Sequence, residues 1–206
     1  MVRGTKKTAF ALALGAVTVL GACKKTDNAA DTTMASADTS MAAGAASSTT
    51  NVPAPAATMS DAAIFAMLGA ANQGEIAAGK MAESKATNAS VKSFARDMVA
   101  AHTKMLNDGV ALAKRLNITP DSAAADSIMA MNQSTAVALT ADAKGATFDS
   151  AYVNAQVAGH QYVLDMVKRA EGAAQNADLK AALTATEPQV QAHLDRITAI
   201  QGKMKM

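Results

Sequence analysis

From residue 60 to the C-terminus, apolar residues recur in steps of three and four, the period of an α-helix with one buried face. The pattern predicts four long helices. The first begins after Ser60, and the other three span about 89–117, 148–171 and 178–203. Ser60 is a suitable N-cap for the first of them. Apolar seams of this spacing are typical of helices that pack in a left-handed bundle. We therefore expect an all-α fold, a four-helix bundle over residues 60–206.

The connection between the second and third helices, Thr119 to Thr147, is too long to be a structureless loop in a compact domain. It contains Ile128 and Leu139 among other apolar residues, so we expect an additional short helix there. A long connection at this place also permits a ferritin-like crossover. Pro188 lies inside the fourth helix, where we expect a kink after which the helix continues.

The N-terminal region has the pattern of an export signal. Arg3, Lys6 and Lys7 precede an apolar run of about a dozen residues, which is shorter than the roughly 20 residues that span a bilayer. The run ends in Leu20-Gly21-Ala22-Cys23, which resembles the lipobox of bacterial lipoproteins. We predict a signal peptide over residues 1–22 and a lipid anchor on Cys23, the single cysteine of the chain.

Residues 23–59 are rich in Ala, Ser and Thr, and residues 24–58 contain no Leu, Ile or Phe. Such a segment cannot bury enough apolar surface to offset the entropy lost on ordering, so we expect a disordered tether. Lys24 stands where an Asp would favour retention in the inner membrane. We therefore expect a protein of the cell envelope, anchored by lipid in the outer membrane and facing the periplasm.

Composition supports a helical domain without basic character. Of the 206 residues, 52 are Ala and only 3% are aromatic, which favours helices over strands. The formal charge of +2 comes from the signal peptide, because residues 60–206 contain 14 basic and 14 acidic residues. A neutral domain in this compartment is not expected to bind nucleic acid.

Four polar residues occupy positions on the apolar seams, one in each long helix and near its middle: Glu75, His102, His160 and His193. The midpoints of equally long helices share one layer of a bundle, so we expect the four side chains to converge. Three imidazoles and a carboxylate make a complete set of ligands for zinc or copper, and a plausible one for iron. The alternative is a buried polar network without metal, in which the histidines bond to Glu75, Gln156, Thr186 or water.

Other chemistry has little support in the sequence. No glutamate is followed by a histidine three residues later, so a ferritin-type di-iron centre is not predicted. The motifs of serine hydrolases, phosphate loops and dinucleotide-binding folds are also missing. An enzyme is disfavoured, because four protein ligands leave zinc no open position. Gly69, Gly74 and Gly79 are interpreted as points of close helix packing.

The chain from about Ser60 onward resembles the exported bacterial domain-of-unknown-function family 4142. The resemblance is carried by residues 94–99 (FARDMV) leading to His102, by residues 148–152 (FDSAY) leading to Gln156 and His160, and by Pro188 before His193. It implies a ferritin-like helical bundle and export, and it brings no established activity. Ala101 stands where the family often has an acidic residue, which removes one further candidate ligand.

Together these observations predict a lipid-anchored envelope protein that binds a zinc, copper or iron ion in its helical core. The membrane is its expected partner, through the lipid anchor at Cys23. The alternative is a structural or stress-related envelope module that binds a protein or envelope component, or a second copy of itself, through its helix faces.

Overall fold

The computed structural model describes residues 59–204, which are helical and contain no strand. The helices are α1 (Asp61–Lys85), α2 (Ala89–Arg115), the short 3₁₀ helix η1 (Ser122–Ala125), α3 (Asp126–Ala141), α4 (Ala146–Ala173) and α5 (Ala177–Met204). Among these helices none is both long and apolar enough to cross a membrane. The predicted signal peptide, Cys23 and all but the last residue of the predicted tether lie outside the described residues.

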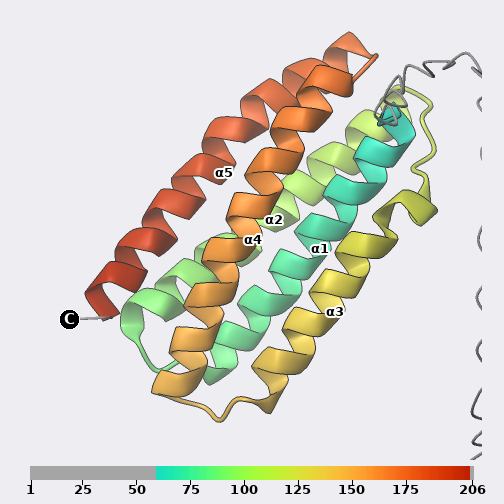
Figure 1. Ribbon diagram of the computed structural model, residues 1–206. Helices are drawn as coiled ribbons and strands as arrows, with labels where there is room; N and C mark the ends of the chain where they lie inside the picture. The colour runs from blue at the N-terminus through green and yellow to red at the C-terminus, as the bar shows by residue number, and fades with distance from the viewer. Residues whose placement is uncertain (1–58, 205–206) are drawn as a thin grey trace, which may run out of the picture. The chain divides into compact units, whose positions relative to one another are not determined.

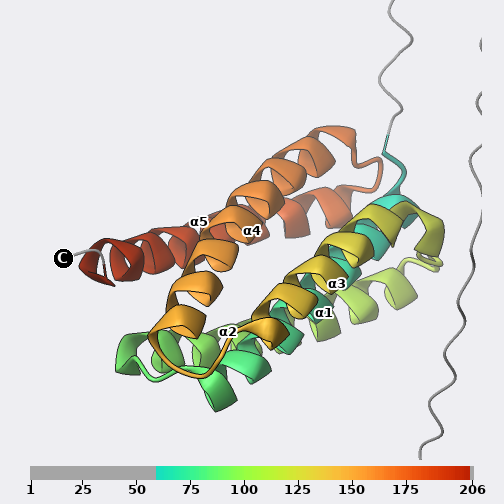
Figure 2. The ribbon, with the colours of Figure 1, turned by 60° about the horizontal axis from the view of Figure 1, so that its bottom comes forward.

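Two antiparallel hairpins form the framework (Figure 1). Helices α1 and α2 make the first and α4 and α5 the second, each pair joined by a connection of three residues. Helix α3 runs along α1 and returns the chain to the end at which α4 starts, so that α2 and α4 run in the same direction. Figure 2 shows the second hairpin packed over the first, with contacts from α4 to α1 and from α5 to α2.

Local sequence sets the helix ends. The Ser60 hydroxyl accepts a hydrogen bond from the Ala63 amide at 3.1 Å, which confirms Ser60 as the N-cap of α1. The Asn88 side chain caps α2 in the same way. Beyond α2, Asn117 takes a left-handed conformation (φ 54°), which asparagine tolerates better than most residues. Helix α5 continues through Pro188 to Met204.

A buried carboxylate fixes one end of the domain. Asp149, in the first turn of α4, is only 2% exposed. It accepts hydrogen bonds from the backbone amides of Thr87 and Asn88 and from the Thr87 hydroxyl at 2.8–3.2 Å. Because these groups form the turn between α1 and α2, Asp149 joins the start of the second hairpin to the bend of the first.

Two of the three glycines highlighted in α1 are close-packing points, as predicted. A Cβ on Gly79 would lie 2.7 Å from the Val99 side chain and 3.1 Å from the Ala95 carbonyl oxygen, and one on Gly74 would overlap the Asn132 amide. The prediction for Gly69 is wrong, because a Cβ there would meet no atom within 4 Å. Gly69 instead borders a cavity between the two hairpins.

Candidate metal centre

Three imidazoles meet in the core, one from each of three helices. His102 comes from α2, His160 from α4 and His193 from α5. Their ring centroids lie 5.4–5.8 Å apart, and one potential ligand atom of each lies within 4.8 Å of the others. His102 and His160 are 4% and 2% exposed, and His193 is half-buried. The predicted convergence of the three histidines is therefore confirmed.

The orientation of His102 is fixed from α1. Its Nδ1 lies 2.8 Å from the side-chain oxygen of Asn72. The Asn72 amide nitrogen donates to the Leu68 carbonyl at 2.9 Å, which assigns the oxygen to the side that faces His102. Because that oxygen only accepts, Nδ1 of a neutral His102 must carry the proton and donate. Its Nε2 is then an unprotonated atom with a free lone pair.

His160 is held in the same manner by its own helix. Its Nδ1 lies 2.9 Å from the backbone carbonyl oxygen of Gln156, one turn earlier in α4. A carbonyl oxygen only accepts, so Nδ1 donates and Nε2 is left as an acceptor. Metal-binding histidines commonly have this arrangement, in which the second ring nitrogen donates to an oxygen and fixes the tautomer.

Burial keeps the imidazoles of His102 and His193 neutral. Loss of hydration, and to a lesser extent the rings of His160 and His193, lower the pKa of His102 from 6.5 to about 3. Burial, followed by the effects of His160 and Arg196, lowers the pKa of His193 to about 4. At neutral pH both rings are therefore uncharged, which is the form that binds a metal ion.

Several buried polar side-chain atoms have no hydrogen-bond partner among the residues that the structure describes. They are Nε2 of His102, Nε2 of His160, Nδ1 of His193, Oε1 of Gln156 and the Tyr152 hydroxyl. Buried polar atoms of native proteins are nearly always bonded, and each exception needs an explanation. Here two of the imidazole atoms are acceptors that lack a donor, which is the electronic requirement for holding a cation.

Glu75 is near the histidines, but the structure does not bring it into their cluster. Its Oε2 accepts a hydrogen bond from the Gln156 side-chain amide at 2.7 Å. Gln156 therefore connects the carboxylate to the cluster, because its backbone oxygen receives the proton of His160. The Thr186 hydroxyl donates to the Ala182 carbonyl and takes no part in this network.

The spacing of the imidazoles is close to that of a metal site. Zinc binds imidazole nitrogen at about 2.0–2.1 Å, so three nitrogens in tetrahedral positions lie about 3.4 Å apart. From a triangle whose sides are at most 4.8 Å, each nitrogen has to move inward by about 1 Å to reach that geometry.

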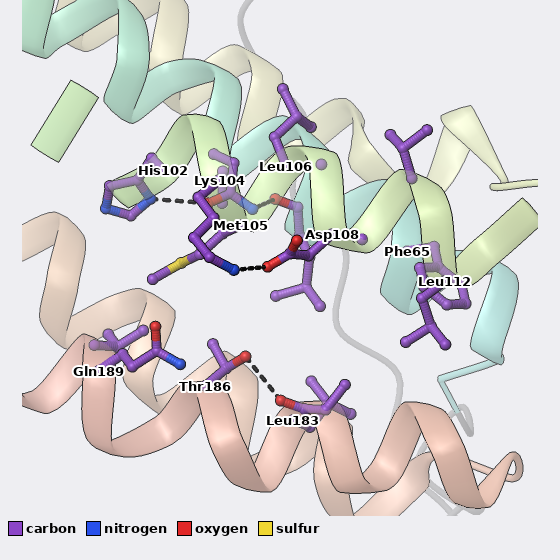
Figure 3. Close-up of a pocket in the computed structure, with 18 of the residues that line it drawn as sticks. Phe65, His102, Lys104, Met105, Leu106, Asp108, Leu112, Leu183, Thr186 and Gln189 are labelled. Atoms are coloured by element: carbon purple, nitrogen blue, oxygen red, sulfur yellow. Dashed lines mark hydrogen bonds and ion pairs between the residues drawn. The ribbon is translucent and has the colours of Figure 1, made fainter. Parts of the chain in front are cut away.

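A cavity of about 420 Å³ lies between the two hairpins beside the cluster. His102 and His160 border it, together with Asn72 and Glu75. The rest of its wall is mostly apolar, including Phe65, Leu68, Leu112, Leu179, Leu183 and Val190. Figure 3 shows Phe65 and Leu112 on one side and Leu183, Thr186 and Gln189 on the other, with the ion pair between Lys104 and Asp108 nearby.

Asn72 and the cavity were not predicted from the sequence. Asn72 follows Leu68 by four residues, so it lies beside the apolar seam of α1 one turn before Glu75. A polar residue in that position was a usable signal for a partner of the histidines. The cavity has no comparable signal, because it depends on the separation of the two hairpins.

Residues 45–200 match the model of a protein family that is described as a domain of unknown function, DUF4142. Neither a curated protein nor a solved structure matches the chain. The family match covers most of the chain and includes all three histidines, Asn72 and Gln156. The protein therefore belongs to the DUF4142 family.

Proposed function

We propose that this protein binds a transition-metal ion through His102, His160 and His193. The observation that supports this most strongly is the meeting of three imidazoles, two of which have their Nδ1 atoms committed to oxygens and their Nε2 atoms unpartnered. Glu75, predicted from the sequence as a fourth ligand, acts in this proposal through Gln156 as an outer partner. The wider fold in this proposal is a ferritin-like four-helix bundle, in which α3 is the crossover between the two hairpins.

Zinc, copper and iron remain the candidate ions. Imidazole nitrogen suits all three, and a site with three neutral nitrogens lacks the thiolates or the carboxylate set that would select one of them. A site with three protein ligands also has an open position, which structural zinc sites do not have. The proposed ion therefore takes its fourth ligand from a molecule other than the three histidines.

We also propose that the protein is located in the bacterial cell envelope. The lipobox-like segment that ends at Cys23 supports a lipid anchor, and the Ala-rich segment after it supports a tether to the membrane. Metabolic labelling with a palmitate analogue tests the anchor. We expect label in the wild-type chain and none in Cys23→Ser; label that persists in Cys23→Ser would contradict the anchor.

Metal titration of the purified chain tests the site. We expect one Zn²⁺, Cu²⁺ or Fe²⁺ per chain in calorimetry, with a dissociation constant below about 1 µM. His102→Gln, His160→Gln and His193→Gln should each weaken binding more than about 100-fold, because loss of an outer partner alone typically costs 10–100-fold. Asn72→Ala should weaken it within that smaller range.

Asn154→Ala is the matched control, because it also removes a helix asparagine, but one whose side chain is exposed and accepts a hydrogen bond from Gln201 far from the histidines. Its metal affinity should equal that of the wild type. Circular dichroism of each variant separates loss of the site from loss of the fold. Binding no tighter than millimolar, or binding unchanged in the histidine variants, would overturn the proposal and favour a metal-free polar network in a structural envelope module.

A further inference from the structure

The cavity beside the histidines has the properties of a ligand site. It lies between α1, α2, α4 and α5 and is partly open to solvent, and its volume of about 420 Å³ falls within the usual range of small-molecule pockets, roughly 300–1,000 Å³. Most of its wall is apolar, while the polar side chains of His102, His160 and Glu75 lie together at one part of it. Small-molecule sites typically combine an apolar wall with a few polar groups in this way.

Two glycines keep side-chain volume out of this cavity. Gly69 in α1 and Gly109 in α2 both border it, and a Cβ on either would meet no atom within 4 Å. A glycine in a helix interior costs about 1 kcal/mol relative to alanine. Close neighbours leave no room for a Cβ at Gly74 and Gly79, which explains the glycine at both positions. No neighbour requires a glycine at Gly69 or Gly109. Their effect is to leave the cavity open.

Two buried histidines at the edge of the cavity have ring nitrogens without a partner among the described residues. His102 and His160 are more than nine-tenths buried, border the cavity and have unpartnered Nε2 atoms. If the three histidines hold a divalent ion, the ion carries two positive charges. The imidazoles around it are neutral, and the Glu75 carboxylate, which also borders the cavity, is hydrogen-bonded to Gln156 rather than placed in the histidine cluster. In a buried and mostly apolar site, an anionic ligand is favoured because it offsets that charge.

We propose that the cavity binds a carboxylate with an apolar body, whose carboxylate oxygen takes the open position on the metal ion and whose body lies between the hairpins. This inference rests on the metal site proposed above. The carboxylate supplies the fourth ligand that the histidines lack, and the apolar body contacts residues such as Leu68, Leu112 and Leu183. The carboxylate coordinates the metal ion, and no covalent bond is made or broken.

Calorimetry of the Zn²⁺-loaded full-length chain with octanoate tests the proposal. Octanoate should bind at least about tenfold more tightly than acetate, which has the carboxylate but hardly any apolar body, and than 1-octanol, which has the body but no anionic donor. 3-Phenylpropionate in a parallel titration distinguishes an alkyl body from an aromatic one. Equal affinity for octanoate and acetate would overturn the proposal.

Variants that fill the cavity with a side chain test where octanoate binds. Gly69→Leu and Gly109→Leu should weaken octanoate binding about tenfold or more while the Zn²⁺ affinity changes less than twofold. Gly172→Leu is the control, because Gly172 also has open space around its Cβ position but lies outside the cavity. Octanoate affinity unchanged in Gly69→Leu and Gly109→Leu would contradict a cavity site.

The design separates this proposal from the metal site on which it rests. If none of Zn²⁺, Cu²⁺ and Fe²⁺ binds, the proposed function is wrong and the carboxylate proposal falls with it. If Zn²⁺ binds and octanoate does not, only the carboxylate proposal is wrong. A visible spectrum of the Co²⁺-loaded chain that changes on addition of octanoate would place the carboxylate on the metal rather than elsewhere on the surface.

Discussion

At the scale of single residues, the tautomers of His102 and His160 decide what this core can bind. In each ring, an oxygen that only accepts takes the Nδ1 proton, so the Nε2 lone pair has no competing partner. A solvated histidine has no such constraint and gains protons near pH 6.5. The two oxygens that hold the rings thus leave each Nε2 as an acceptor without a donor among the described residues.

The lowered pKa of His102 predicts that the metal-free protein loses stability on mild acidification. The folded state resists protonation of His102 down to about pH 3, whereas the unfolded chain gains the proton near pH 6.5. The stabilising contribution is complete above pH 6.5 and is lost as the pH falls below it. At pH 5 the loss from His102 is about 2 kcal/mol. His193 adds a smaller loss in the same direction, because it is partly solvated.

Urea unfolding in a chelator at pH 7 and pH 5 measures this effect. In His102→Gln the free energy of unfolding should change less between the two pH values than in the wild type. This window lies above the range in which ordinary carboxylates titrate, so they contribute little to the difference. A wild-type free energy of unfolding that is the same at both pH values would show that the folded state accepts the protons.

At the scale of helices, the seams of the sequence predict where each element begins and ends. The second, third and fourth predicted helices agree with α2, α4 and α5 to within two residues at each end. The predicted short helix in the long connection is α3. These predictions succeed because helix period and capping are local properties of the chain.

The candidate site was predictable only in part, for a physical reason. A position on the apolar seam indicates which face of a helix a residue occupies. This information was enough to predict that the side chains of His102, His160 and His193 converge. It does not state which neighbour a flexible side chain will bond to. Glu75 therefore lies on the expected face but bonds to Gln156. The cavity depends on how far apart two helix pairs lie, which no local pattern encodes.

Helix α1 also offers a comparison of two glycines in one element. Gly79→Ala should lower the free energy of unfolding by about 1–2 kcal/mol, because its Cβ would press on the stiff Val99 side chain and approach the Ala95 carbonyl. Gly69→Ala should raise it by up to about 1 kcal/mol, because helix propensity improves and nothing is displaced. Denaturant unfolding of both variants measures the difference. Equal effects would show that α1 is free to shift against α2.

At the scale of the whole molecule, the proposed ion joins the two hairpins. His102 belongs to the first hairpin, and His160 and His193 belong to the second. Beside the histidines, the hydrogen bond from Gln156 to Glu75 already links the two hairpins, and Arg196 pairs with Asp97 from α5 to α2. The proposed ion would add three further bonds between the hairpins next to the cavity. Metal binding is thus expected to stabilise the contact between hairpins more than either hairpin alone.

Zinc should therefore raise the thermal stability of the whole domain. At a free Zn²⁺ concentration of about 100 times the dissociation constant, the gain is about 2.7 kcal/mol. For a domain of this size that corresponds to a rise in Tm of roughly 5–10 °C, which differential scanning calorimetry measures and a chelator should reverse. An equal rise in His102→Gln would show that the ion acts elsewhere on the protein.

The distribution of the three histidines along the chain also orders the events of biogenesis. A polypeptide synthesised from its N-terminus presents His102 first, while His160 and His193 arrive with the last two helices. The first hairpin, once made, has only one of the three nitrogens and cannot hold an ion in the proposed manner. In this proposal the ion can be held only after α4 and α5 have been made, and a truncated chain that lacks α5 should purify without a bound ion.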